Sequence, residues 1–176
     1  MAPIREDGPD RIEVHVAGAC VRFEDGRWQL LAGRRTDTRS LFPGKWECGG
    51  GQVRKGEDFQ AAVRRQFFEE FGLEVTPLHV IEPYTIHVPV RHVIPGVRFL
   101  CLARTGIVRL NNREFSEYRW LDLPLSAPDL DWIPGLKETL DTHVSPAILN
   151  QLFEPAPKPP GDSQRQTPGF IQPKAG

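Results

Sequence analysis

The feature that most constrains this sequence is a glycine-rich turn followed directly by a short amphipathic helix. The turn reads GGGQVRKGE (residues 49–57), and the helical pattern covers residues 58–71. Gly72 follows as the expected C-terminal cap, because glycine readily adopts the left-handed conformation that ends many helices. Three successive glycines allow a ligand to approach the backbone closely and allow N–H groups to point at a phosphate. A glycine-rich stretch alone is a weak signal, so its meaning depends on what the helix carries.

The helix carries carboxylates next to a face that is expected to be buried. At about 100° per residue, its apolar side chains fall on one stripe, with the last member at the margin: Phe59, Val63, Phe67 and Phe71. Gln66 and Glu70 lie on or beside this stripe, and Glu69 lies at its edge. A core-facing carboxylate without a partner costs several kcal/mol, so Glu70 requires a cation, a hydrogen-bond network or an open cleft. Oxygens at positions i, i+3 and i+4 can converge on a hard cation such as Mg²⁺, whereas the alternative is two solvated charges at a helix end.

The spacing of the fixed residues is more specific than either half alone. It reads Gly51-x5-Glu57-x7-Arg65-Gln66-Phe67-x-Glu69-Glu70-x-Gly72-Leu73. This resembles the Nudix box, G-x5-E-x7-R-E-U-x-E-E-x-G-U, in which U is a bulky apolar residue. Every fixed position matches except Gln66, which stands where the box has its first glutamate after the arginine. Similar flanking segments (LLAGRR and PGKWECGGG before the box, EFSEYRWL after it) extend the resemblance to about residues 12–125.

The resemblance implies both a fold and a reaction. The expected fold is α+β, an α/β/α sandwich in which a mixed β-sheet lies between helices. The expected reaction is Mg²⁺- or Mn²⁺-dependent hydrolysis of the diphosphate bond in a nucleotide-like small molecule, such as a nucleoside triphosphate or a nucleotide sugar. Glu69 and Glu70 match metal-binding positions, Gln66 stands at a further one, and the carbonyl of Gly50 would be a backbone ligand.

The resemblance also assigns roles to residues further from the helix end. Glu57 and Arg65 match a pair that braces the loop against the helix in the family. Glu114 resembles a late acidic residue that binds metal or acts as a base in some members, and Glu117 competes for that role. The predicted catalytic residues are accordingly Glu69, Glu70 and Glu114.

Contacts to the substrate are expected from the ends of strands and from the glycine turn. Arg34 and Arg35 end a strand and could grip a phosphate, and the alternative for both is a solvated strand end. Lys45 is a similar but weaker candidate, and Gly51 offers backbone that a phosphate can approach. An aromatic residue such as Tyr84 or Phe99 could stack a nucleobase, and the sequence does not distinguish them.

Gln66 leaves two hypotheses open. Glutamine can coordinate a cation through its carbonyl oxygen, but it brings no negative charge and cannot accept a proton as a general base. In the first hypothesis hydrolysis persists, with Glu69, Glu70 and a late acid holding the metal. In the second, the protein is a catalytically weak or silent module that binds a nucleotide or metabolite. The retained spacing of the other box residues favours hydrolysis, and an isomerase on the same fold has less support.

The rest of the chain indicates one mixed α+β domain. Strand patterns cover residues 11–23, 28–35, 73–88, 90–104 and 117–123, the first two forming a hairpin. A long loop covers residues 36–58, and Pro95-Gly96 predicts a bulge or an edge in its strand. Residues 133–153 are expected to be helical in two pieces, because Pro146 interrupts them. The predicted organisation is a flexible N-terminus at 1–10, the domain at 11–153 and a disordered proline-rich tail at 154–176.

The overall composition limits the partners that the protein can have. A net charge of −1 gives no basic field to recruit a nucleic acid polymer, and the short apolar runs do not suit a membrane span. The first ten residues lack the pattern of a secretory signal, and the three cysteines form no CxxC pair. These features predict a cytoplasmic protein. Phe68 projects away from the apolar stripe, which leaves homodimerisation open.

Overall fold

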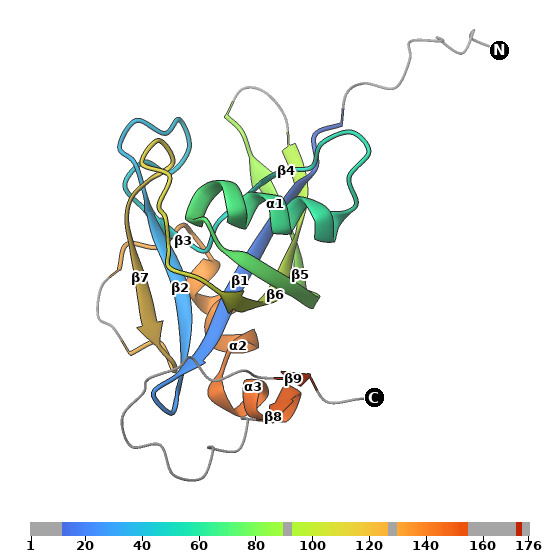
Figure 1. Cartoon of the computed structure of the whole chain (residues 1–176). Helices are drawn as coiled ribbons and strands as arrows, with labels where there is room; N and C mark the ends of the chain where they lie inside the picture. Colours follow the sequence, from blue (N-terminus) through green and yellow to red (C-terminus); the bar gives the residue numbers. More distant parts are fainter. Residues whose placement is uncertain (1–11, 90–92, 127–129, 155–171, 174–176) are drawn as a thin grey trace, which may run out of the picture.

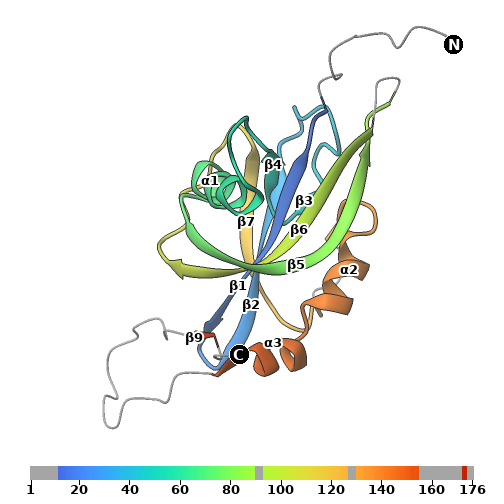
Figure 2. The ribbon, with the colours of Figure 1, turned by 90° about the vertical axis from the view of Figure 1, so that its right-hand side faces the viewer.

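A mixed β-sheet forms the middle layer of the molecule, with helix α1 on one face and helices α2 and α3 on the other (Figures 1 and 2). The computed structural model describes residues 12–89, 93–126, 130–154 and 172–173. The strands are β1 His15–Glu24, β2 Arg27–Arg35, β3 Trp46–Glu47, β4 Gly50–Gln52, β5 Glu74–His87, β6 Val93–Thr105, β7 Phe115–Asp122, β8 Phe153–Glu154 and β9 Gln172–Pro173. The helices are α1 Phe59–Phe71, α2 Leu136–His143 and α3 Pro146–Leu152.

The sheet combines antiparallel hairpins with one parallel pairing at its centre. Its main strand order is β3-β2-β1-β6-β5, with β7 paired to β2 and β4 paired to β1. Strands β1 and β2 form the expected antiparallel hairpin, and β5 and β6 form a second, longer one. Strand β1 runs parallel to β6, so the sheet is mixed. The expected α/β/α arrangement with a mixed sheet is confirmed.

Alternation along β1 explains why the protein has a core on each face of the sheet. Val16 and Cys20 contribute to the core beneath α1, whereas Ala19 and Val21 contribute to the core beneath α2 and α3. Successive side chains of a strand point to opposite faces, so a strand with helices on both sides must be apolar throughout. The central segment of β1 is accordingly buried.

Helix α1 begins and ends where the sequence predicts, but its first turn is less buried than expected. Asp58 caps the N-terminus by accepting a hydrogen bond from the backbone N–H of Ala61, and Gly72 adopts a left-handed conformation after the last turn. The prediction that Phe59 faces the core is wrong, because its side chain is 43% exposed. Periodicity gives the direction of a side chain but not whether the sheet extends beneath it. Phe68 is exposed, as its position opposite the stripe predicts.

The remaining expectations agree with the structure in part. Residues 133–153 contain two helices, and Pro146 occupies the first turn of α3 behind the capping Ser145. Of the bulge or edge expected at Pro95-Gly96, the bulge is absent, because the pairing of β5 with β6 is regular there and shifts elsewhere. The pairing of β1 with β6 begins at Gly96, so Pro95 lies where β6 loses its neighbour on that side. Within the predicted tail, β9 pairs with β8, while residues 155–171 and 174–176 lie outside the described residues, as does the predicted flexible N-terminus.

All three cysteines are free and buried. In the part of the chain that the structure describes, no helix is long and apolar enough to cross a lipid bilayer.

Candidate active site

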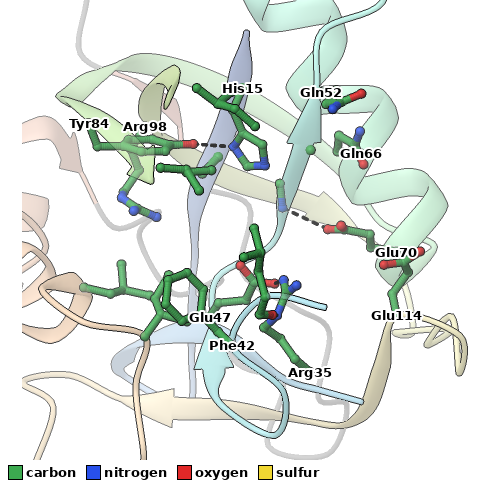
Figure 3. Close-up of a pocket in the computed structure, with 18 of the residues that line it drawn as sticks. His15, Arg35, Phe42, Glu47, Gln52, Gln66, Glu70, Tyr84, Arg98 and Glu114 are labelled. Carbon is green, nitrogen blue, oxygen red and sulfur yellow. Dashed lines mark hydrogen bonds and ion pairs between the residues drawn. The ribbon is translucent and has the colours of Figure 1, made fainter. Parts of the chain in front are cut away.

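A cleft of about 1210 Å³ extends from the end of α1 to the β5–β6 hairpin and the start of α2. Its walls come from α1, β4, the start of β1, the hairpin and the start of α2. Figure 3 shows Glu70 and Glu114 on one side of this space and Tyr84 and Arg98 on the other. The cleft therefore brings together segments that are far apart in the sequence.

Glu70 is the buried charge of the site. Its side chain is 6% exposed, and its Oε2 accepts a hydrogen bond of 3.0 Å from the backbone N–H of Gly50 (Figure 3). Burial raises the pKa of Glu70 well above its ordinary value, and the carboxylates of Glu47 and Glu114 raise it further. A carboxyl group in such surroundings either keeps a proton or requires a compensating cation.

The glycine turn is shaped around this carboxylate. A Cβ atom on Gly49 would lie 2.8 Å from Oε2 of Glu70 and 2.7 Å from the ring of Phe71, and the φ angle of Gly49 is +86°. Both the space and the backbone conformation therefore require glycine at this position. The turn and the helix end form a single unit, which explains why the two sequence patterns occur together.

Gln66 lies directly over the next part of the turn. A Cβ atom on Gly51 would lie 2.1 Å from Nε2 of Gln66, so the glycine is needed to make room for the amide. Both residues line the cleft. An uncharged amide therefore occupies the place beside Glu70 where the Nudix box has a carboxylate, and it lowers the negative charge of the site.

Glu114 is brought to the end of α1 by a turn that binds the helix terminus. The backbone N–H of Asn111 donates to the carbonyl oxygen of Glu70 at 2.8 Å, and the N–H of Glu114 donates to the carbonyl of Asn111 at 2.9 Å. The side chain of Glu114 lines the cleft and forms an ion pair of 2.5 Å with Arg39. Glu117, the competing candidate, pairs with Arg119 and is not among the residues that line the cleft. The geometry thus favours Glu114 as the late acidic residue.

Glu57 and Arg65 form the expected contact between the loop and the helix. Arg65 donates to both carboxylate oxygens of Glu57, at 2.5 and 2.9 Å, and to the carbonyl oxygen of Gln52 at 2.9 Å. The hydrogen bonds from Arg65 to Glu57, together with one from the backbone N–H of Arg54, lower the pKa of Glu57 to about 2. The pair holds the turn against the first part of α1.

Glu69 is engaged by two arginines. Arg54 donates to both of its carboxylate oxygens, at 3.0 and 3.3 Å, and Arg65 donates to one of them at 3.1 Å. Arg54 lies in the loop, where the sequence resemblance gave it no role. The carboxylate of Glu69 lines the cleft, but a cation must compete with these arginines for it.

Of the two arginines at the end of β2 that were predicted to contact phosphate, only one lies on the side of the strand that borders the cleft. Arg35 lines the cleft and pairs with Glu47, while Arg34 points away and contacts Ser116 and Asp37. Adjacent residues of a strand project to opposite faces, so only one of the two arginines can reach this cleft.

Two further positions also differ from expectation. Lys45 is not a lining residue, because it pairs with Asp131 at 2.5 Å, so a phosphate contact in the cleft by Lys45 is not supported. Arg39 does line the cleft, and sequence reasoning missed it because nothing in the sequence places this loop arginine opposite Glu114.

Burial distinguishes the two aromatic residues that were considered for stacking a nucleobase. Phe99 is packed into the core beneath α1 and has no access to a ligand. Tyr84 lines the cleft, where it contacts His15 and Arg98. The polar residues around Tyr84 were not predicted, because they come from β1, β5, β6 and α2 and share no sequence pattern.

The donor chemistry of the site suits a hard divalent cation, although Glu69 and Glu114 are paired with arginines. Among the described residues, no three or more His, Cys, Asp or Glu side chains already form a group that could hold a metal ion. Among the residues that line the cleft, Glu69, Glu70, Glu114 and Gln66 carry side-chain oxygens at or near the end of α1, and Glu47 and Asn111 line it as well. The carboxyl group of Glu70, whose pKa is raised by burial and then by its acidic neighbours, is the feature that a bound cation would stabilise most.

Comparison with known sequences agrees with the box. The family model described as NUDIX domain matches residues 13–141. Nucleoside triphosphatase NudI of Escherichia coli O17:K52:H18 (strain UMN026 / ExPEC) is 31% identical over 108 residues, which cover 55% of this chain and 74% of that protein. The protein of the same name from Shigella flexneri serotype 5b (strain 8401) is 31% identical over 109 residues, with the same coverage.

Solved structures share the fold at lower sequence identity. A MutT protein from Methanosarcina mazei Go1 has a TM-score of 0.61 at 20% identity and covers 76% of this chain and 94% of its own. An Ap4A hydrolase of C. elegans has a TM-score of 0.60 at 18% identity, covering 73% and 93%. The NUDIX domain of Shewanella oneidensis NrtR, complexed with ADP ribose, has a TM-score of 0.59 at 16% identity, covering 81% and 94%. With the family model matched over most of the domain, the chain belongs to the Nudix hydrolase family.

Proposed function

We propose that this protein is a divalent-metal-dependent hydrolase that cleaves the diphosphate bond of a nucleoside diphosphate derivative, such as a nucleoside triphosphate or a nucleotide sugar. The observation that carries the proposal is the buried carboxylate of Glu70, which faces an open cleft beside Glu47 and Glu114. A cation would relieve the repulsion among these groups. Relatives named nucleoside triphosphatase NudI and Ap4A hydrolase support a nucleotide as the substrate.

The residues that would hold Mg²⁺ or Mn²⁺ are oxygen-bearing residues that line the helix end of the cleft. They are Glu69, Glu70 and Glu114, with the carbonyl of Gly50 and the amide oxygen of Gln66 as neutral donors. When bound, the cation would polarise the phosphoryl group and lower the pKa of a water molecule. Glutamine leaves this donor set with one negative charge fewer than the Nudix box provides.

The protein residues themselves would bind the phosphates and accept a proton. Glu114 is the proposed acceptor for the proton of the attacking water, because the amide of Gln66 cannot take one. In the free protein Arg39 holds Glu114, and Arg35 holds Glu47. Both arginines line the cleft and can transfer their hydrogen bonds to phosphate oxygens, which match a guanidinium group well. That transfer would free Glu114 as the phosphate chain enters.

A second candidate function is binding without efficient turnover. Gln66 removes one carboxylate from the site, and the two arginines that hold Glu69 neutralise another. A cation would then be held mainly by Glu70 and Glu114, which lowers both affinity and catalytic power. This candidate keeps the cleft and its ligand while losing the hydrolysis.

The test is phosphate and pyrophosphate release over a panel of nucleoside triphosphates, nucleotide sugars, ADP-ribose and dinucleoside polyphosphates, with Mg²⁺ or Mn²⁺. We expect turnover with at least one class and a loss of about 100-fold or more in Glu70→Gln, because the variant removes the buried charge that holds the cation. The matched control is Glu117→Gln, which changes a carboxylate outside the cleft and should leave the rate unchanged.

Three results distinguish the candidates. Turnover that Glu70→Gln abolishes and Glu117→Gln preserves supports the hydrolase. Turnover that appears only in Gln66→Glu identifies the native protein as the binding module. A native rate that survives Glu70→Gln contradicts the proposed mechanism.

A further inference from the structure

A cluster of polar side chains lies at the end of the cleft that faces away from α1. We call it the Arg98 cluster, and its members are His15 of β1, Glu82 and Tyr84 of β5, Arg98 of β6 and Thr139 of α2. All five line the same cleft as Glu70. Figure 3 shows Tyr84 and Arg98 across the space from the carboxylates, with His15 above it. A ligand whose phosphates lie beside Glu70 can therefore extend toward this cluster.

Arg98 is a buried cation with hydrogen-bonding capacity left over. The residue is 6% exposed, its Nε donates to Oε1 of Glu82 at 3.0 Å, and its guanidinium lies 4.9 Å from the ring centre of Tyr84. Among the described residues, its two terminal nitrogens have no hydrogen-bond partner. Every fully buried side-chain nitrogen or oxygen in the described chain does have a partner, so these two must be accessible from the cleft. Figure 3 shows the end of this side chain directed into that space.

The surroundings fix the position of Arg98 and balance its charge. Glu82 uses one oxygen for Arg98 and the other for the hydroxyl of Thr139 at 3.0 Å, so the carboxylate is held on both sides. The ion pair of Arg98 and Glu82 has no net charge. Burial, with smaller contributions from nearby arginines, lowers the pKa of His15 to about 4, so this histidine is neutral near pH 7. A neutral site suits a neutral polar ligand edge better than a further phosphate.

The two terminal nitrogens of Arg98, which we call its free edge, determine which hydrogen-bonding groups the ligand must present. The terminal nitrogens of a guanidinium group only donate hydrogen bonds, and they do so side by side in a fixed plane. Guanine presents two adjacent acceptors, O6 and N7, on one edge. Adenine presents N7 beside an amino donor, which would face the arginine with donor against donor.

We propose that the Arg98 cluster is the nucleobase subsite of the cleft and that the free edge of Arg98 selects guanine through O6 and N7. The proposal deepens the proposed function, since it rests on a nucleotide being the ligand. Tyr84 contacts the guanidinium group, His15 hydrogen-bonds the Tyr84 hydroxyl, and the two side chains form the wall beside the base. Glu82 positions Arg98, because one of its oxygens accepts from Arg98 and the other is held by the hydroxyl of Thr139.

The test is direct binding of GMP, AMP, CMP and UMP by isothermal titration calorimetry in the presence of EDTA. Without metal no hydrolysis is required, so failure of the proposed reaction and failure of this subsite can be distinguished. We expect GMP to bind roughly 10- to 100-fold more tightly than AMP, the range expected for one bidentate arginine–guanine contact. In Arg98→Lys, which keeps a charge for Glu82 but has no planar fork, this preference should fall to about twofold or less.

The control variant is Arg104→Gln, which removes an exposed arginine from the same strand outside the cleft and should keep the preference for GMP. Thermal unfolding of each variant establishes that it is folded before binding is compared. Equal binding of GMP and AMP by the native protein overturns the proposal, as does a preference for GMP that survives in Arg98→Lys. Tightest binding of CMP, whose O2 and N3 are also adjacent acceptors, overturns the assignment to guanine. Selective GMP binding that depends on Arg98 supports the subsite even if no substrate is hydrolysed.

Discussion

Replacing Glu70 with glutamine is expected to stabilise the metal-free protein while it removes the proposed cation site. Glu70 is almost fully buried, and its pKa is raised well above the ordinary value by burial and by Glu47 and Glu114. Glutamine has nearly the same shape and keeps an oxygen that can accept the hydrogen bond from Gly50. The variant therefore removes the cost of the charge and preserves the packing.

The pKa shift limits how large the gain can be. A carboxyl group whose pKa is raised on folding contributes most to stability below its unfolded pKa, and that contribution is lost as the pH rises. The ordinary value is 4.5, and one pH unit corresponds to about 1.4 kcal/mol, so at pH 7 Glu70 can cost at most about 3.4 kcal/mol. We expect Glu70→Gln to recover about 1–3 kcal/mol of this at pH 7 and little at pH 4.5. The corresponding rise in melting temperature is roughly 2–4 °C per kcal/mol for a chain of this size.

Urea denaturation in EDTA between pH 4.5 and pH 8 measures this difference, and the gap between variant and native protein should widen with pH. Adding Mg²⁺ or Mn²⁺ should then stabilise the native protein but not Glu70→Gln. Glu57→Gln is the control with the opposite sign. The pKa of Glu57 is lowered to about 2 by Arg65 and Arg54, so its charged form stabilises the fold above pH 4.5 and this contribution is lost as the pH falls toward 2. Removing it should weaken the fold at pH 7.

One result would refute the reasoning about Glu70. If Glu70→Gln is less stable than the native protein at pH 7, with the same gap at pH 4.5, the buried charge is not costly and the carboxylate must be satisfied within the fold. The case for a cation at this position would then lose its main physical support.

Three further changes test other parts of the cleft. Gln66→Glu should tighten Mn²⁺ binding by roughly tenfold in calorimetry, because it adds a charged oxygen donor at the helix end. Arg54→Gln should also strengthen Mn²⁺ binding, by about two- to fivefold, because it releases one of the two arginines that hold Glu69. Finally, stability should fall as the pH drops from 6.5 to about 4, since the unfolded chain protonates His15 before the folded protein does. That loss is at most about 3.4 kcal/mol, and urea denaturation should show it removed in His15→Gln.

The helix end of the site could be predicted because its geometry is local. The distance in sequence between Gly51 and Glu70 is covered by one turn and one helix, so spacing alone determines which side chains meet. The capping residues Asp58 and Gly72 and the contact between Glu57 and Arg65 follow from the same short-range pattern. In each of these cases, residue type and spacing carry most of the information.

The other contacts of the cleft depend on pairings that no local pattern contains. Arg39 meets Glu114 because the loop after β2 and the turn before β7 both lie at the end of α1. The positions of Arg34 and Arg35 show the same limit in a smaller way. Alternation predicts that they face opposite sides of β2, but only the assembled sheet determines which of them reaches the cleft.

The Arg98 cluster shows why long-range order decides specificity in this protein. His15 and Gly96 are neighbours only because β1 and β6 run parallel in the middle of the sheet, and Tyr84 joins them through the β5–β6 hairpin. In sequence, Arg98 is simply a charged residue in an apolar strand, for which a solvated edge would be the ordinary expectation.

The arginines that hold the carboxylates have a consequence for how the ligand and the cation bind. Arg39 pairs with Glu114, and Arg54 with Glu69, so the free protein already neutralises part of the acidic site from within. A cation alone must displace these arginines without offering them a new anion. A nucleotide supplies that anion, because its phosphates can accept the hydrogen bonds that the carboxylates give up. Within the proposed function, Mn²⁺ and nucleotide should therefore each bind more tightly in the presence of the other, and by linkage the two enhancements must be equal. Neutralising Arg39 should reduce this coupling, because Glu114 would then be free before the nucleotide arrives.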